Sequence, residues 1–383
     1  MNHESTRRRF VVTVGAGSVG ATAGCTGRFS GRNSNATDPD GGEETVDGGN
    51  ANDRGDDETN DRGDDGTSER GDDATTDSSD ESEETEDVPS VDGGAVVFVY
   101  DDGPIEDYEQ AFPVHQEFDA PASVGIVTEW IGRTDFNDTD WMDDHHLEEL
   151  AAAGWEISSH TTRHTALSAF ELVEDAVEGD TRIYPEQRNH GFHHGHEIEV
   201  TDGEESVRRT IVDSDHDDVG VYLEFDDPLE TSFRAGEAVE RYPADVMHEF
   251  LGESKRELER MGFTVDTLLA PYDAVDEWTV EIAREYYDGI ANARPGSMFN
   301  EPEGFDPLET RRDYFVEFTT PADVEADLDR VAEEEAIGVL GAHTFKAEVT
   351  ADRIRETLEW VEKRDLEVLT FRDAIRAVDG DRR

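Results

Sequence analysis

Two short groups of residues in this chain have the types and spacing of a hydrolytic metal site. Asp101 and Asp102 follow the apolar run Ala95–Tyr100, and His160 and His164 lie four residues apart at the end of a second expected strand. A catalytic Zn²⁺ site needs about three protein ligands, an open position for water and a base. Asp102, His160 and His164 are therefore candidate ligands for Zn²⁺ or another divalent transition metal, and Asp101 is the candidate base. The alternatives are an acidic first turn of a helix and a chance pair among 13 histidines.

The elements that must position these residues alternate between strands and helices from about Val91 onward. The expected strands are 95–100, 122–128, 156–159, 264–270, 289–293, 337–342 and 366–370. The expected helices are 105–118, 141–153 with Asp140 as its N-cap, 244–261, 277–287, 321–336 and 350–364. Repeated strand–helix units imply a parallel sheet covered by helices. We therefore predict an α/β fold, a distorted seven-stranded (β/α) barrel.

Further polar residues follow other expected strands. Pro271 and Tyr272 follow the fourth strand, and His343 follows the sixth. The catalytic groups of α/β barrels gather at the carboxyl ends of the strands, so these residues are expected to join the metal site.

The segment 181–242 breaks the alternation of strands and helices, because it shows β-like patterning and turns. We predict a β-rich insertion beside the catalytic face. Its histidines form either a second metal site or, since no strand scaffold supports them, a loop that faces the substrate. They are His190, His193, His194 and His196.

These motifs resemble those of the NodB-type polysaccharide deacetylases, carbohydrate esterase family 4. Residues 100–104 resemble the first motif, Thr-Phe-Asp-Asp-Gly-Pro, and residues 160–164 resemble the second, His-Ser/Thr-x-x-His. Residues 269–272 resemble the third, Arg-x-Pro-Tyr, and His343 matches the histidine of the fifth. The similarity covers about 91–379, apart from the insertion.

The resemblance implies a hydrolase of carbon–nitrogen bonds other than peptide bonds, which deacetylates N-acetylated sugars of a polysaccharide or glycan. Asp102, His160 and His164 would hold the metal. Asp101 would activate the metal-bound water, and His343 would protonate the leaving amine as general acid. Pro271 and Tyr272 would line the substrate, with the backbone N–H of Tyr272 at the oxyanion.

The chain departs from the family pattern at two motifs. Leu269 stands where the family has the arginine that orients the base, and residues 293–296 lack the Asp and Trp of the fourth motif. Arg163 and Arg294 are candidates for the missing guanidinium. The departures favour two alternatives: a hydrolase of non-polymeric amides, and a carbohydrate-binding lipoprotein without catalysis. A sugar groove would also draw on aromatic residues, although such residues more often pack in a core. The candidates are Trp130, Trp155 and Trp278.

The composition is strongly acidic. The net charge is −63, and lysine occurs only at Lys255, Lys346 and Lys363. Most of the excess acid lies outside residues 28–90, so the folded part is acidic too. Such a surface repels itself unless concentrated salt screens it, which predicts a halophilic protein of haloarchaeal type. Nucleic acid is excluded as a partner because its phosphates carry the same sign of charge.

The first 27 residues have the features of an export signal with a lipoprotein-like cleavage site. Arg7, Arg8 and Arg9 precede an apolar stretch, 11–23, that is too short to span a bilayer comfortably. This pattern resembles a twin-arginine signal, and Cys25 follows small residues as an acylated cysteine would. Residues 28–90 are nearly free of apolar side chains, which predicts a disordered acidic linker. We expect an extracellular protein that contacts the membrane only through an N-terminal lipid anchor.

Overall fold

The computed structural model describes residues 91–381, apart from 92 and 138. The predicted export signal, Cys25 and the acidic linker lie outside the described residues, so their assignments stay predictions.

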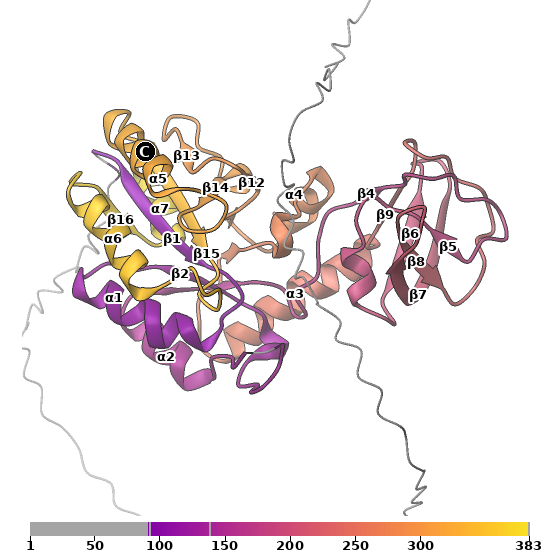
Figure 1. Cartoon of the computed structure of the whole chain (residues 1–383), viewed down its shortest axis with the longest axis horizontal. Coiled ribbons are helices and arrows are strands. Elements are labelled where there is room, and N and C mark those ends of the chain that lie inside the picture. The colour runs from indigo at the N-terminus through magenta and orange to yellow at the C-terminus, as the bar shows by residue number, and fades with distance from the viewer. Residues whose placement is uncertain (1–90, 92, 138, 382–383) are drawn as a thin grey trace, which may run out of the picture. The chain divides into compact units, whose positions relative to one another are not determined.

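Ten strands of the described chain form one curled, mainly parallel sheet (Figure 1). The main path runs β11-β10-β3-β2-β1-β15-β14-β12, while β13 pairs with β15 and β16 pairs with β1. The strands are β1 (Ala95–Tyr100), β2 (Ser123–Ile126), β3 (Glu156–Ser159), β10 (Thr267–Leu268), β11 (Gly289–Ile290), β12 (Arg294–Pro295), β13 (Phe299–Asn300), β14 (Arg311–Tyr314), β15 (Ile337–Ala342) and β16 (Glu367–Leu369). The path ends at β11 and β12 without joining them, so the sheet is a half-barrel.

The sequence predicted the α/β class correctly but not the number of strands. A strand is present at each of the seven expected positions, and three more lie between 294 and 314. These three strands were missed because they are two to four residues long and lack the apolar pattern of a buried strand.

The central strand β1 is buried on both faces, which explains its continuous apolar sequence. Successive side chains point to opposite faces of a strand. Val96 and Phe98 therefore belong to the larger hydrophobic cluster, while Val97 and Val99 belong to a second cluster that includes helix α7 (Phe371–Asp381). Burial on both faces is typical of parallel sheets, and it holds the end of β1 rigidly in place.

Helices connect the parallel strands. They are α1 (Phe112–Glu117), α2 (Asp144–Ala152), α3 (Ala244–Arg260), α4 (Glu277–Ala283), α5 (Pro321–Glu333), α6 (Ala351–Glu362) and α7, which was not predicted. A π-helical turn, Asp107–Ala111, precedes α1. Helix α2 begins at Asp144 and not at 141, because Asp143 and His146 form a reciprocal capping box. No described helix is long and apolar enough to cross a membrane.

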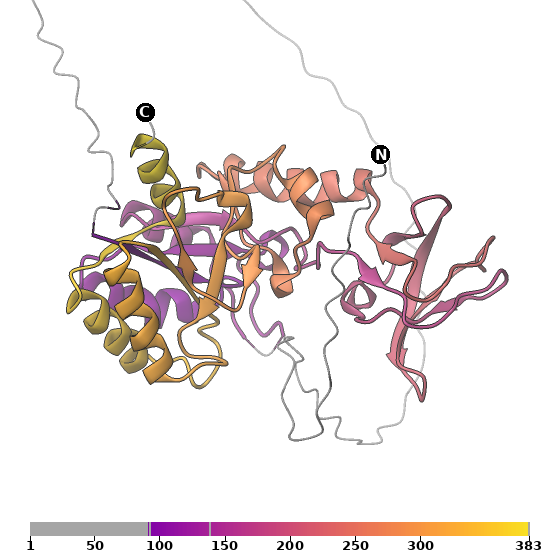
Figure 2. The same ribbon diagram turned by 90° about the horizontal axis from the view of Figure 1, so that it is seen from above.

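The β-rich insertion forms a separate antiparallel sheet of six strands within the described chain (Figures 1 and 2). Its order is β4-β9-β6-β7-β8-β5. The strands are β4 (Phe170–Glu171), β5 (Arg182–Ile183), β6 (Glu197–Thr201), β7 (Ser206–His216), β8 (Val221–Phe225) and β9 (Val239–Arg241). The sheet thus begins at Phe170, earlier than the expected boundary at 181.

Candidate active site

The loops that leave β1 and β3 position the candidate metal ligands. Asp101 continues the pairing of β1 with β15, since its N–H donates to the Ala342 carbonyl at 3.1 Å. The His160 N–H likewise donates to the Ile126 carbonyl at 2.9 Å, at the end of β3. Asp102 and His164 then take left-handed backbone conformations, with φ of 80° and 58°. Such conformations are uncommon outside glycine and are often found at functional sites.

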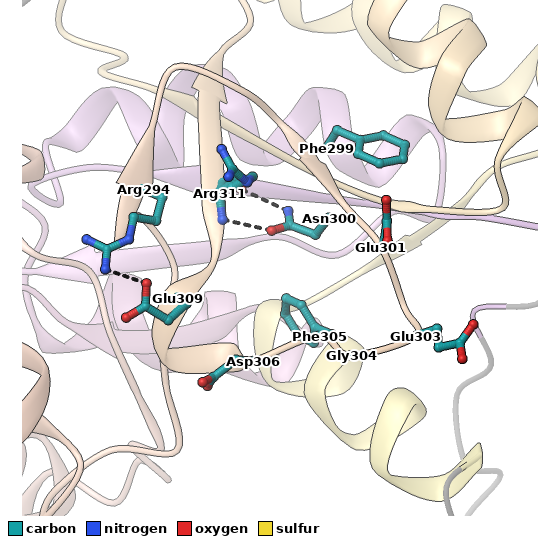
Figure 3. A pocket seen from close by; sticks show the side chains of 10 residues that line it. All are labelled: Arg294, Phe299, Asn300, Glu301, Glu303, Gly304, Phe305, Asp306, Glu309 and Arg311. Atoms are coloured by element: carbon teal, nitrogen blue, oxygen red, sulfur yellow. Dashed lines mark hydrogen bonds and ion pairs between the residues drawn. The ribbon is translucent and has the colours of Figure 1, made fainter. Parts of the chain in front are cut away.

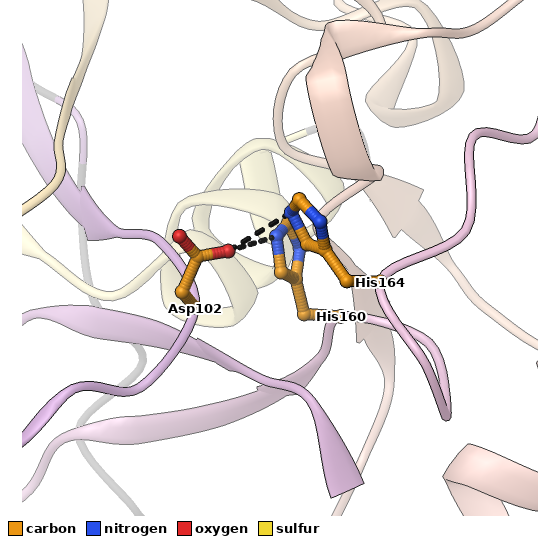
Figure 4. A group of neighbouring side chains, drawn as sticks. All are labelled: Asp102, His160 and His164. Carbon is orange, nitrogen blue, oxygen red and sulfur yellow. Dashed lines mark hydrogen bonds and ion pairs between the residues drawn. The ribbon is translucent and has the colours of Figure 1, made fainter. Parts of the chain in front are cut away.

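Asp102, His160 and His164 converge on one point (Figure 4). The Nε2 atoms of His160 and His164 lie 3.1 and 3.0 Å from the same oxygen of Asp102, Oδ1. One ligand atom of each residue lies within 4.8 Å of the other two, and no other group of this kind occurs in the described chain. Two imidazole nitrogens and a carboxylate oxygen are a ligand set suited to Zn²⁺ and similar transition metals.

Neighbouring residues orient His160 and shift the pKa values of Asp102 and His164 in the direction that favours metal binding. His160 Nδ1 donates to the Leu269 carbonyl at 2.6 Å, which fixes the ring with Nε2 directed at Asp102. Burial by itself would raise the pKa of Asp102, but the neighbouring His164 and hydrogen bonds from both histidines lower it well below the usual value. Burial also lowers the pKa of His164, against the opposing effect of Asp102. A neutral histidine beside an ionised carboxylate is the protonation state that metal ligation requires.

Asp101, unlike Asp102, binds a buried arginine. Arg312 Nη1 donates to Asp101 Oδ1 at 2.5 Å, and Nη2 donates to Asp273 Oδ1 at 2.6 Å. The guanidinium is almost completely buried. Burial opposes its charge, but the two carboxylates outweigh that effect and raise the pKa of Arg312 well above its usual value. The cation therefore persists and holds both carboxylates in fixed positions.

Neighbouring residues secure this arginine. A Cβ atom at Gly341 would lie 2.9 Å from Arg312 Cζ, so glycine at this position of β15 leaves room for the guanidinium. Tyr314 accepts from Arg312 Nη2 at 2.9 Å and donates to Asp273 Oδ2 at 2.9 Å. Asn292 donates to Asp273 Oδ1 at 2.6 Å from the other side. Arg312 thus belongs to a closed network of hydrogen bonds and ion pairs.

Neither arginine proposed from the sequence replaces the missing guanidinium. Arg163 pairs with Glu129 at 2.6 Å, and Arg294 pairs with Glu309 at 2.5 Å. Arg294 lines a pocket of about 430 Å³ that contains none of the candidate site residues (Figure 3). In the same pocket, Asn300 accepts from the backbone N–H of Arg311 at 2.7 Å. This contact holds the strand on which Arg312 lies.

His343 lies on the far side of Asp101 and has a carboxylate partner of its own. Its Nε2 is 3.5 Å from Asp101 Oδ2, and its Nδ1 donates to Glu317 Oε1 at 2.8 Å. Burial lowers the pKa of His343, but Asp101 and the hydrogen bond to Glu317 outweigh burial, so the pKa is raised. Glu317 follows β14 and was not singled out from the sequence, where it is one of many acids. Its place beside His343 is that of the carboxylate missing from the fourth motif.

Tyr272 and Pro271 lie at the edge of the metal ligands. The Tyr272 ring is centred 4.4 Å from that of His164, and its backbone is left-handed with φ of 63°. Pro271 is buried beneath this turn. Of the three tryptophans considered for a sugar groove, Trp130 packs 5.2 Å from His164, whereas Trp155 stacks on the buried Tyr100 and Trp278 packs under Arg241.

The four clustered histidines of the insertion, His190, His193, His194 and His196, do not form a second metal group within the described chain. His190 is fully buried, with Nδ1 2.7 Å from Glu240 and Nε2 3.1 Å from the Ala166 carbonyl. His193 Nε2 lies 3.3 Å from the His164 carbonyl, and His193 also stacks on His196 at 4.9 Å. Burial lowers the pKa of His193 to about 3, so it is neutral. The cluster attaches the insertion to the segment that carries His164.

Comparison with known proteins shows to which family the chain belongs. A family model described as polysaccharide deacetylase matches residues 89–286, slightly more than half of the chain. The chain belongs to the polysaccharide deacetylase family. A member of this family is a hydrolase of carbon–nitrogen bonds other than peptide bonds, a deacetylase. The match includes Asp101, Asp102, His160 and His164, while Arg312 and the residues after it lie beyond its end.

Several solved structures resemble the chain at low identity. One is the Xyl-CE4 domain of a multidomain xylanase from the hindgut metagenome of Trinervitermes trinervoides, with a TM-score of 0.38, 9% identity, and coverage of 73% of this chain and 89% of that one. A family 4 carbohydrate esterase from Streptomyces lividans, in complex with acetate, has a TM-score of 0.37, 9% identity and coverage of 71% and 90%. The BpsB deacetylase domain from Bordetella bronchiseptica has a TM-score of 0.32, 19% identity and coverage of 56% and 70%. No curated protein matches the chain in sequence. The family assignment rests on the family model alone.

Replacing Arg312 by lysine is expected to reduce activity and stability together. Lysine keeps the positive charge but cannot bridge two carboxylates with a planar fork. We expect kcat/KM for deacetylation to fall about 100-fold, and the free energy of unfolding to fall by about 3 kcal/mol. The neighbouring Arg311→Lys, on an exposed side chain of the same strand, is the matched control. If Arg312→Lys and Arg311→Lys had equal kcat/KM and equal unfolding temperatures, the ion pair between Arg312 and Asp101 would be unimportant for activity and stability.

Proposed function

We propose that this deacetylase is a divalent-metal-dependent enzyme that removes acetyl groups from N-acetylated sugars of a polysaccharide or glycan. One observation carries the proposal: two adjacent carboxylates have separate partners. Asp102 joins the two histidines of the metal group, whereas Asp101 is clamped by the buried guanidinium of Arg312. A hydrolytic metal site requires metal ligands together with a base that is not itself a ligand.

The residues of the metal group favour a transition metal over Mg²⁺ or Ca²⁺. Two imidazoles and one carboxylate suit Zn²⁺, whereas the hard alkaline-earth ions prefer oxygen ligands throughout. When bound there, the ion would polarise the acetamide carbonyl and make water more acidic.

Asp101 would accept the proton of the attacking water. Arg312 holds its Oδ1, so Oδ2 is directed towards the side occupied by His343. The fixed guanidinium prevents the carboxylate from rotating out of this position. The base is thus oriented before the substrate arrives, which removes an entropic cost from the reaction.

His343 is placed to donate a proton from Nε2 to the leaving amine. Its Nδ1 proton is held by Glu317, which fixes the ring and stabilises the imidazolium. The backbone N–H of Tyr272, beside His164, would stabilise the tetrahedral oxyanion. The products would be a free amino sugar and acetate.

The non-catalytic alternative rested on the missing third- and fourth-motif residues. Arg312 and Glu317 supply a guanidinium to Asp101 and a carboxylate to His343 from β14 and the turn after it. Residues from another part of the chain therefore supply both missing groups, the guanidinium and the carboxylate, which supports catalysis.

Metal removal and an Asp101→Asn substitution test the proposed function. We expect purified protein to contain about one Zn²⁺ or similar ion per chain, and to release acetate from N-acetylglucosamine oligomers. Chelation should abolish this activity, and Asp101→Asn should lower kcat by roughly 10²- to 10⁴-fold. Asp119→Asn, at an exposed position, should have no effect. Protein without stoichiometric metal, or full activity in Asp101→Asn, would contradict the proposal.

Replacing Glu317 by glutamine should move the pH dependence. Glu317 raises the pKa of His343, so its loss lowers that pKa. A general acid must be protonated, and activity is lost as pH rises through its pKa. The alkaline limb of the kcat/KM profile should therefore shift to lower pH in Glu317→Gln. The exposed Glu348→Gln should keep the original profile. An alkaline limb unmoved by Glu317→Gln would mean that His343 is not the acid.

We also propose that the protein is exported by the twin-arginine route, anchored by a lipid on Cys25, and active outside the cell at high salt. The arginine run, the placement of Cys25 and the net charge of −63 support this. In a host that secretes twin-arginine substrates, the full chain should fractionate with membranes, and Cys25→Ser should release it. The unfolding temperature should rise steeply towards molar salt. Retention of Cys25→Ser in membranes would exclude the anchor, and a salt-independent unfolding temperature would exclude adaptation to salt.

A further inference from the structure

The metal-ligand candidate His164 lies on a loop that has no helix or strand of its own. This loop, residues 161–169, connects β3 to β4, and its backbone is left-handed at Thr161 and His164, with φ of 64° and 58°. Most of its residues are buried. Buried backbone carbonyls need hydrogen-bond partners, because an unpaired polar group away from water costs free energy. The position of His164 therefore depends on the groups that bind this loop.

The half-barrel binds the first part of the loop. The carbonyls of Thr161 and Thr162 accept backbone N–H groups from the turn that follows β2, at 3.3 and 3.0 Å. The Thr161 hydroxyl also accepts the N–H of Thr165 at 3.2 Å, within the loop itself. The two bonds from the half-barrel reach only residues that precede His164.

The insertion binds the remainder of the loop through histidine side chains. His193 Nε2 donates to the carbonyl of His164 itself, at 3.3 Å. His190 Nε2 donates to the carbonyl of Ala166, two residues further on, at 3.1 Å. Two carbonyls of the loop, one of them on the candidate ligand, therefore have their partners in the insertion.

A third histidine of the insertion contacts the residue before the candidate ligand. Arg163 Nη1 donates to His196 Nε2 at 3.2 Å, and His196 Nδ1 lies 3.0 Å from the hydroxyl of Tyr242. The rings of His193 and His196 stack with their centres 4.9 Å apart and their planes 11° apart. Histidines spaced three residues apart in the insertion thus bind three neighbouring residues of one loop.

The antiparallel sheet of the insertion holds these histidines in place. His190 is fully buried, and its Nδ1 lies 2.7 Å from the carboxylate of Glu240 on β9. The hydroxyl of Ser214 on β7 donates to the Gly191 carbonyl at 2.7 Å, and Ser214 leaves no room for a side chain at Gly191. Strands β7 and β9 both pair with β6. The turn that carries His190 is therefore fixed to the sheet from two sides.

These contacts leave the histidines little capacity to bind a metal themselves. Ligation requires a ring nitrogen with an available lone pair. Both ring nitrogens of His190 lie against protein oxygens, and both ring nitrogens of His196 contact other side chains. His193 directs Nε2 at the His164 carbonyl. The three histidines thus act as hydrogen-bonding groups towards the loop.

We propose that the insertion is a positioning element for the metal centre: His193 and His190 fix the backbone that carries His164 and thereby raise the affinity of the site for its ion. Neither side chain would touch the ion. Groups that orient a metal ligand from outside commonly change metal affinity by about 10- to 100-fold. This inference rests on the proposed function, because it takes His164 as a metal ligand.

The affinity for Zn²⁺ tests the inference, measured by competition with a chromophoric chelator on the full-length protein without substrate. We expect His193→Ala to bind Zn²⁺ about 10- to 100-fold more weakly than the unmutated protein. His193→Gln should restore most of the affinity, because its amide N–H can still donate to the carbonyl, whereas the shorter amide of His193→Asn should not. His194→Ala, at the exposed neighbouring position, is the matched control and should keep the original affinity.

A spectroscopic measurement reports the geometry of the site directly. The visible absorption of Co²⁺ bound in place of Zn²⁺ depends on how its ligands are arranged. His193→Ala should change this spectrum, and His193→Gln should preserve it. Because the side chain of His193 is only partly buried, folding should be preserved, and thermal unfolding of the metal-free protein checks this.

The outcomes separate this inference from the proposed function. An affinity that depends on His193 supports the positioning element even if the protein releases no acetate, and in that case the proposed deacetylation alone fails. Equal Zn²⁺ affinity in His193→Ala and the unmutated protein overturns the positioning element and leaves the deacetylase intact. A second bound Zn²⁺ that disappears in His193→Ala would make the histidines ligands and also overturns the inference. An unmutated protein that binds no Zn²⁺ overturns both.

Discussion

The site depends on one buried cation. Arg312 lies between the carboxylates of Asp101 and Asp273 and is sealed from water by β15 and its neighbours. Two carboxylates confined so closely in a poorly polarisable interior would repel each other and take up protons. The guanidinium offsets this repulsion and fixes the positions of both carboxylates. Asp101 is thereby held directly beside Asp102, which contacts the two histidines.

Different strands of the curled sheet carry residues with different proposed roles. Strands β1 and β3 are followed by the residues that would hold a metal, and β1 also by the proposed base, Asp101. Strands β14 and β15 carry or precede Arg312, Glu317 and His343, which are the partner of that base, the partner of the proposed acid, and the acid itself. Asp101 and Asp102 are consecutive, yet Asp101 binds Arg312 of β14, whereas Asp102 binds the two histidines. The left-handed backbone at Asp102 contributes to this separation.

The ligand group was predictable because strong patterns surround it. Asp102 follows the apolar strand β1, and His160 and His164 follow the expected strand β3 at a spacing of four residues; parallel strands bring such positions to one edge. Arg312 and Glu317 were not predictable, because β14 has the sequence Arg-Arg-Asp-Tyr and its place depends on pairing with β15. In a chain with 96 acidic residues, no local signal distinguishes Glu317 from the others. The strands between 294 and 314 were missed for the same reason, because their short sequences carry no local signal.

Leu269 shows why the guanidinium comes from another strand. Its side chain is fully buried in the second hydrophobic cluster, the one that contains Val97, Val99 and residues of α7. It also closely approaches Gly125. An arginine there would have to displace this packing. A long side chain anchored on β14 delivers the same functional group to the same carboxylate without disturbing the interior. The guanidinium partner of Asp101 is therefore visible only in the folded structure, because the residue that supplies it lies outside the linear motif.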